Sequence, residues 1–127
     1  RREHRGTRAH DRDLSDRSQL ARFGESVAAA YLSHRGGSVV ARNLPVGRGE
    51  IDLLVRFGGR HVAVEVKTVG SSALAGDPIE RITPAKLAQV RALAGVLAAR
   101  YGRMRVDFVG VRVEATGVTV NWRQNVA

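Results

Sequence analysis

The sequence predicts an α/β domain in which a β-sheet is flanked by helices, with the elements in the order α-β-β-β-α-β-β. Two segments carry apolar residues at helical spacing, and five shorter segments alternate or cluster apolar residues between Gly-containing turns. The 127 residues are 43% hydrophobic and 26% charged, which is typical of one globular domain. A chain of this size buries roughly two-thirds of its unfolded surface, so it needs neither disulfides nor metal ions to fold.

The N-terminal segment differs in composition from the rest. Residues 1–17 contain one apolar side chain larger than Ala, Leu14, among many charges. Such a segment cannot bury enough apolar surface to offset the entropy of ordering. We therefore expect residues 1–17 to form a flexible basic arm and residues 18–127 to form a single domain.

The first helix is expected to run from a cap at Ser18 to about His34, where Gly36 and Gly37 end it. At 100° per residue, Glu25 falls on the margin of the apolar stripe of this helix. A carboxylate at this position can point along the surface of the core. The stripe is formed by Leu20, Phe23, Gly24, Val27 and Tyr31.

Five strands and a second helix follow. Asn43-Leu44-Pro45 is expected to end the first strand, and 69–82 reads as a loop because it is rich in Gly, Ser and Pro. Thr83 caps the second helix and Pro84 opens it. The expected elements are strands 38–42, 49–57 and 60–68, a helix 84–101, and strands 105–113 and 118–123.

A two-residue turn at Gly58-Gly59 fixes the register of the central hairpin. Phe57 then faces Arg60, and the pairs that follow bring apolar side chains together on one face of the sheet. The opposite face brings like and unlike charges together. The apolar face carries Val55 with Val62, Leu53 with Val64, and Ile51 with Val66; the other face carries Asp52 with Glu65, and Glu50 with Lys67.

Two carboxylates that face each other across strands repel, and burial increases the cost. A divalent cation between Asp52 and Glu65 would remove that conflict, and oxygen ligands favour Mg²⁺ or Mn²⁺. The backbone carbonyl of Val66 is a candidate third ligand. Lys67 lies on the same face and, unlike Arg, can lose its proton. The alternative is an ordinary strand with an exposed Glu-Lys face.

Four short motifs together resemble a known family: Gly24-Glu25, ARN at 41–43, GEIDLL at 49–54 and VEVKT at 64–68. They look like the uncharacterised bacterial YraN family, which is predicted to have a restriction-endonuclease-like fold with the PD-(D/E)XK site pattern and is similar to Holliday junction resolvases. The resemblance implies a mixed sheet and a metal-dependent endonuclease that hydrolyses phosphodiester bonds in DNA.

The resemblance also implies a role for each residue. Asp52 and Glu65 would hold the metal ion, Lys67 would position or activate water, and Glu25 would complete the acidic cluster. Glu50 would orient Lys67 as an ion-pair partner. Three basic residues are expected to contact nucleic acid: Lys86, Arg42 and Arg48.

Two residues outside the cluster have open assignments. Asp107 fits either a supporting position beside the metal site or a salt bridge with Arg105 or Arg103. Trp122, the only tryptophan, is expected to pack in the core, with base stacking or a dimer contact as alternatives.

Charge and composition limit the function classes. The formal net charge of +9 and the pI near 11.4 indicate a polyanionic partner such as DNA. The alternative is a genome that favours Arg codons, because all but two of the 21 Lys and Arg residues are Arg. The absence of Cys excludes disulfide scaffolds, thiolate metal sites and Cys nucleophiles. No membrane span or signal peptide is recognisable, so a cytoplasmic protein is expected.

Other functions compatible with the same residues are a DNA-binding module that does not cleave, a nuclease that needs a partner, and a structural protein with an acid–Arg network. A homodimer is expected by analogy with resolvase-like relatives.

Overall fold

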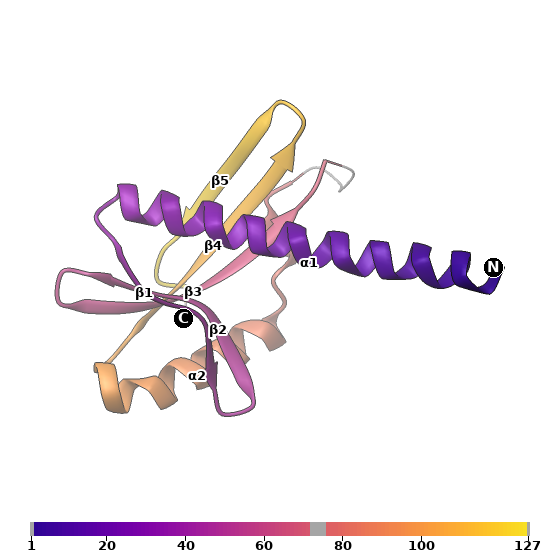
Figure 1. The fold of residues 1–127 in the computed structure, drawn as a ribbon. Coiled ribbons are helices and arrows are strands. Elements are labelled where there is room, and N and C mark those ends of the chain that lie inside the picture. The colour runs from indigo at the N-terminus through magenta and orange to yellow at the C-terminus, as the bar shows by residue number, and fades with distance from the viewer. Residues whose placement is uncertain (1, 72–75, 127) are drawn as a thin grey trace.

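A computed structural model describes residues 2–71 and 76–126, with side chains from residue 16 onward in the first helix. The elements follow the predicted order α-β-β-β-α-β-β, with a short 3₁₀ helix added before the second α-helix (Figure 1). They are α1 (Arg2–His34), β1 (Ser38–Val46), β2 (Gly49–Phe57), β3 (Arg60–Val69), η1 (Pro78–Arg81), α2 (Pro84–Tyr101), β4 (Arg105–Glu114) and β5 (Gly117–Arg123).

The five strands form one mixed sheet in the order β1-β2-β3-β4-β5. Neighbouring strands are antiparallel except β3 and β4, which are parallel and are connected through η1 and α2. A parallel pair needs such a crossover, because a tight turn can join only antiparallel strands. The predicted α/β class and the mixed sheet flanked by helices are therefore confirmed.

The two helices cover opposite faces of the sheet (Figure 1). Val62 and Val64 of β3 lie in the cluster under α1, whereas Ala63 between them lies in the cluster under α2. This alternation follows from the two-residue period of a strand. The central strands are therefore buried on both sides.

The start of the first helix differs from the prediction. α1 begins at Arg2 rather than at Ser18, and its N-terminal part extends beyond the sheet as a single helix (Figure 1). The prediction that the first helix begins at Ser18 is therefore wrong. That residues 1–17 act as a separate arm beside an 18–127 domain stays a prediction.

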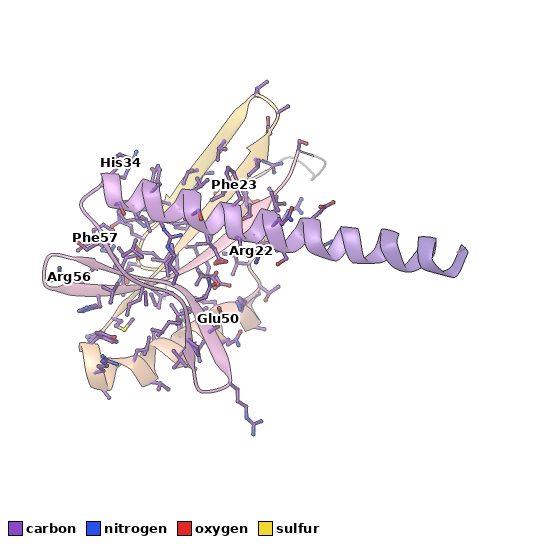
Figure 2. All side chains as sticks on the ribbon, in the orientation of Figure 1. Arg22, Phe23, His34, Glu50, Arg56 and Phe57 are labelled. Atoms are coloured by element: carbon purple, nitrogen blue, oxygen red, sulfur yellow. The ribbon has the colours of Figure 1, made fainter. Side chains whose placement is uncertain are left out.

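The face that α1 buries is also shifted from the predicted stripe. Phe23 is 48% exposed, whereas Ala28, Ala29 and Leu32 are at most 1% exposed. The side chain of Phe23 is labelled on the ribbon in Figure 2. α1 therefore approaches the sheet largely through small residues. The predicted stripe was based on large apolar side chains, and it wrongly included Phe23.

Two segments expected to be irregular contain regular structure. β1 continues through Asn43 to Val46, with a register shift between Val39 and Ala41 and a positive φ of 48° at Asn43. Within the predicted loop 69–82, η1 is capped by Asp77, whose Oδ1 accepts from the Ile79 amide over 3.0 Å. The part of that loop at 72–75 lies outside the described residues.

None of the helices in the described part of the chain combines the length and apolar composition needed to cross a bilayer.

Candidate functional site

The site lies where β2 separates from β3. The predicted hairpin register is confirmed as far as the pair Leu53 and Val64, where the ladder ends. Leu53 packs in the cluster under α1, but Ile51 packs in the cluster under α2. Side chains two residues apart on a regular strand share a face, so β2 changes direction at Asp52. The prediction that Ile51 shares the face of Leu53 is wrong.

The Asp52 side chain bridges the gap between the two strands. The Val66 amide donates a hydrogen bond to Asp52 Oδ2 over 2.9 Å. In an unbroken ladder of the predicted register, this amide would donate to the carbonyl of Ile51. The Asp52 carboxylate thus replaces a backbone acceptor, and it is held beside Glu65, the residue that precedes Val66 in β3.

Glu65 is a buried carboxylate, with 7% of its surface exposed. Burial, and then the charge of Asp52 and a hydrogen bond with it, raise the pKa of Glu65 from 4.5 to about 8, although Lys86 acts in the opposite direction. The structure therefore brings Asp52 and Glu65 together, as the sequence predicted, and their negative charges are only partly compensated.

Lys86 is the cation that contacts Glu65. Its Nζ lies 3.4 Å from Glu65 Oε2. Lys86 stands in the first turn of α2, where its amide donates to the Oγ1 of the cap residue Thr83 over 3.1 Å. α2 thus places one lysine over the carboxylate that β3 buries. Lys86 was expected to contact phosphate, and its contact with Glu65 was not predicted, because nothing in the local sequence joins positions 65 and 86.

Glu25 and Glu50 meet through an asparagine. With its nitrogen turned toward them, the Asn43 amide donates to Glu25 Oε1 over 2.7 Å and to Glu50 Oε1 over 3.1 Å. Burial, and then the charge of Asp52, raise the pKa of Glu25, while the Asn43 hydrogen bond lowers it. Glu25 therefore belongs to the acidic cluster. Asn43 therefore belongs to the candidate site, and its contacts with the two glutamates were not predicted, although its motif was noticed.

The close approach of α1 to β3 positions Glu25. Gly24 has no space for a side chain, because a Cβ atom there would overlap the side chain of Thr68. A glycine at this position lets the helix lie directly on the strand. Glu25, the next residue of α1, is thereby carried toward Asp52.

Lys67 does not make the predicted ion pair. Glu50 bonds to Asn43 instead, and no hydrogen bond or ion pair joins Lys67 to any described residue. Figure 2 shows Glu50 at one end of β2 and Phe57 at the other. Lys67 is exposed beside a hollow of about 270 Å³ between α1 and β3. The hollow is lined by Arg17, Leu20, Ala21, Val66, Lys67 and Thr68.

The two arginines expected to contact nucleic acid are both exposed on the β1 side. Arg42 Nη1 lies 3.3 Å from Ser26 Oγ on α1, close enough to the acidic cluster to oppose the raised pKa of Glu25. Arg48 stands in the turn between β1 and β2. Arg42 thus lies beside the acidic cluster and Arg48 at the end of the adjacent hairpin.

Whether these residues suit a metal ion depends on their present partners. In the part of the chain that the structure describes, no three His, Cys, Asp or Glu side chains are grouped as metal ligands. Glu25, Asp52 and Glu65 are each held by a different donor. Two adjacent, partly uncompensated carboxylates do fit Mg²⁺ or Mn²⁺, which bind through one or two carboxylates plus water and phosphate.

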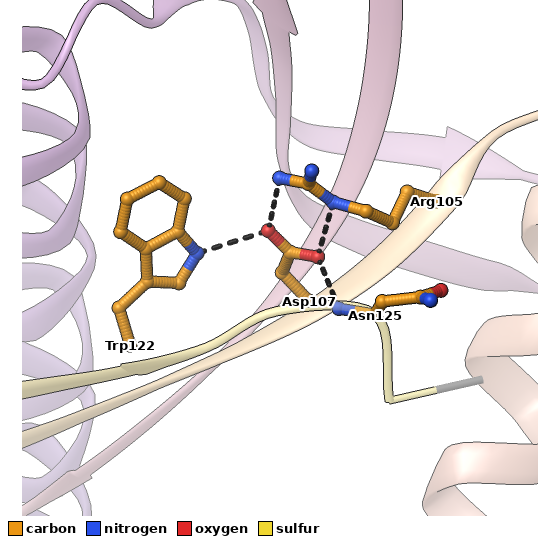
Figure 3. A network of polar contacts seen from close by, with 4 residues as sticks. All are labelled: Arg105, Asp107, Trp122 and Asn125. Carbon is orange, nitrogen blue, oxygen red and sulfur yellow. Dashed lines mark hydrogen bonds and ion pairs between the residues drawn. The ribbon is translucent and has the colours of Figure 1, made fainter.

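A second buried carboxylate has a structural role. Asp107 is fully buried and accepts four hydrogen bonds, including a forked pair from Arg105 at 2.8 Å. The other two come from Trp122 Nε1 and the Asn125 amide, both at 2.9 Å (Figure 3). Of the two alternatives left open for Asp107, the structure shows the salt bridge, with Arg105 as the partner. Trp122 also stacks on Phe57 with ring centroids 5.5 Å apart, so its expected packing role is confirmed.

Comparison with known proteins places the chain in a family. A family model described as uncharacterised protein family UPF0102 matches residues 24–111, which include the whole acidic cluster. A UPF0102 protein of Leifsonia xyli subsp. xyli is 38% identical over 112 residues, covering 88% of this chain and 92% of that protein. One from Kineococcus radiotolerans is 42% identical over 103 residues, covering 77% and 84%.

A solved structure also matches, that of Pyrococcus furiosus SfsA in complex with Ca²⁺. The match has a TM-score of 0.36 and 14% identity, and it covers 88% of this chain and 64%, less than two thirds, of SfsA. The family assignment therefore rests on the sequence matches. The chain belongs to the uncharacterised protein family UPF0102, the YraN-like family that its motifs indicated.

Proposed function

We propose that this protein is a metal-dependent endonuclease that hydrolyses phosphodiester bonds in DNA and selects its substrate by shape rather than by sequence. The observation that carries the proposal is the pair Asp52 and Glu65, held together at the edge of a bent strand with one lysine as partner. The pair attracts a divalent cation, while a net charge of +9 attracts a polyanion.

The chain's own residues divide the work. Asp52 and Glu65, with the carbonyl of Val66, would hold Mg²⁺ or Mn²⁺. When bound, the ion would supply a Lewis acid for the phosphate and its leaving oxygen. Lys67, exposed two residues after Glu65 in the sequence, would orient the attacking water or take its proton. Glu25 would hold a further water or ion.

Four residues have supporting roles in the proposal. Glu50 and Asn43 fix Glu25 instead of orienting Lys67, as their hydrogen bonds indicate. Arg42 and Arg48 would contact backbone phosphates from the β1 side, where they are exposed. Such contacts position a duplex without reading its bases, which agrees with recognition of shape.

A second candidate is a DNA-binding protein of the same fold that does not cleave, or cleaves only with a partner. The contact between Lys86 and Glu65 favours it, because this ammonium already partly compensates the carboxylate that the ion would need. An acid–Arg network receives less support, since Arg105 and Arg123 pair with Asp107 and Asp77 and not with Asp52 or Glu65.

Cleavage assays separate these functions. The wild-type protein is incubated with Mn²⁺ or Mg²⁺ and duplex, branched or flapped DNA, beside Asp52→Asn and Glu65→Gln. Glu114→Gln, which changes an exposed acid at the end of β4, is the matched control. Cleavage by the wild type and the control that is lost in both site variants supports the nuclease. Salt-dependent binding without cleavage supports the second candidate, and cleavage that survives in Asp52→Asn indicates contamination.

A further inference from the structure

We propose that Lys86 is the resident cationic partner of Glu65, and that it leaves this carboxyl group when a divalent cation binds to Asp52 and Glu65. The inference rests on the proposed metal site and concerns how that site is regulated. Lys86 would then compete with the ion, so metal binding would release an ammonium group at the place where the DNA strand arrives.

The geometry shows which member of the pair can move. Nζ of Lys86 lies 3.4 Å from Glu65 Oε2, and 9% of the Glu65 side chain is exposed against 39% of the Lys86 side chain. Glu65 is held in the sheet beside Asp52. Lys86 has a long, flexible side chain with a route to solvent, so it is the partner that can be displaced.

The position of Lys86 on its helix points the same way. It lies in the first turn of α2, which contains no acidic residue. The N-terminal end of a helix carries partial positive charge, so a lysine there is unfavourable for the helix. Contact with Glu65 offsets this effect. A lysine released from Glu65 would remain beside a helix end that favours phosphate.

The neighbouring carboxylates are compensated differently. Asp52 accepts from the Val66 amide, and Glu25 accepts from Asn43, both of which are uncharged donors. Among the contacts described for these three acids, the one with Lys86 alone is an ion pair. An ion that carries two positive charges would replace the ammonium at Glu65 while leaving the other two hydrogen bonds in place.

Binding of Mn²⁺ alone, followed by calorimetry without DNA, tests the inference. Lys86→Met removes the competitor, and the variant is expected to bind Mn²⁺ about fivefold more tightly than the wild type. Lys86→Arg places a forked guanidinium that holds a carboxylate more firmly, and it should weaken Mn²⁺ binding. The control is Arg91→Met, an exposed residue of α2 that removes the same charge; its affinity should stay within about twofold of the wild type.

The outcomes are distinguishable. Equal or weaker binding by Lys86→Met, with wild-type binding intact, overturns the inference and leaves the proposed nuclease standing. No Mn²⁺ binding by any of the proteins overturns both. If Lys86→Met does not fold by circular dichroism, Lys86→Gln replaces it.

The lysine signals provide a second readout. The chain contains two lysines, Lys67 and Lys86, so selective ¹³Cε labelling gives two NMR signals that Lys67→Arg assigns. Titration with Mg²⁺ should shift the Lys86 signal toward that of a solvated lysine. A Lys86 signal that does not move while Mg²⁺ binds contradicts the displacement.

Discussion

Replacing Glu65 with Gln should change how the stability of the metal-free protein depends on pH. Glu65 has a pKa near 8 in the folded protein against 4.5 when exposed. Between these values the folded state keeps a proton that the unfolded state has released. Its contribution to stability is therefore fully present below about pH 4.5 and is lost as the pH rises through about 8.

The size of the effect follows from this difference in pKa. One pH unit inside the window corresponds to at most about 1.4 kcal/mol of unfolding free energy. From pH 5.5 to 7.5 the wild type should lose roughly 2–3 kcal/mol through Glu65 alone. Gln has nearly the same shape and cannot ionise, so Glu65→Gln should lack this part of the slope and be the more stable protein at pH 7.5.

The assay is urea unfolding in EDTA at several values of pH, with the two proteins compared at each. The two proteins share every other side chain, so the difference between their free energies isolates the effect of residue 65. The difference between the unfolding free energies of the two proteins should change between pH 5.5 and 7.5. A difference that stays constant over this range would show that burial and Asp52 do not raise the pKa of Glu65.

Three further changes have defined outcomes. Gly24→Ala should lower the unfolding free energy by about 1–3 kcal/mol, because the new methyl group overlaps Thr68, and it should weaken Mn²⁺ binding by displacing α1. Gly95→Ala is the same change at an open position of α2, and it should instead raise the unfolding free energy by up to about 1 kcal/mol. Equal effects of the two changes in thermal melts would contradict the close contact between Gly24 and Thr68. Asp107→Asn should cost about 3 kcal/mol in urea unfolding, since it leaves the partly buried Arg105 without its charged partner. The variant should keep wild-type Mn²⁺ affinity; loss of that affinity would place Asp107 in the metal site.

Much of the fold follows from local sequence. The Gly58-Gly59 turn sets the register from Phe57 to Leu53, and the cap and proline at Thr83 and Pro84 start α2 where expected. These features depend on backbone chemistry within a few residues. Their prediction needed no knowledge of the rest of the molecule.

The errors arose where distant segments decide the structure. The change of direction at Asp52 depends on two separate cores, which assign Ile51 and Leu53 to opposite faces. The buried face of α1 is set by how closely Gly24 can approach Thr68, which favours small residues and leaves Phe23 exposed. Periodicity records which residues are apolar but not how near a helix comes to its sheet.

The candidate site was predictable in part for the same reason. Asp52 and Glu65 meet because a short hairpin places them together. Lys86 reaches Glu65 because the start of α2 packs against β3. Asn43 joins Glu25 to Glu50 because β1 brings it to both α1 and β2. Pairing within a hairpin is encoded locally, whereas these contacts depend on the packing of separate elements.

The most direct test of the account is a thermal and urea melt of the protein with and without Mn²⁺, repeated on Asp52→Asn and Glu65→Gln. Ligand at about 100 times its dissociation constant stabilises a folded protein by about 2.7 kcal/mol. The wild type should gain stability of this order from Mn²⁺, and both variants should lose most of the gain. A wild type that is unaffected by Mn²⁺, or variants that gain as much as the wild type, would contradict the claim that these two carboxylates together bind a divalent cation.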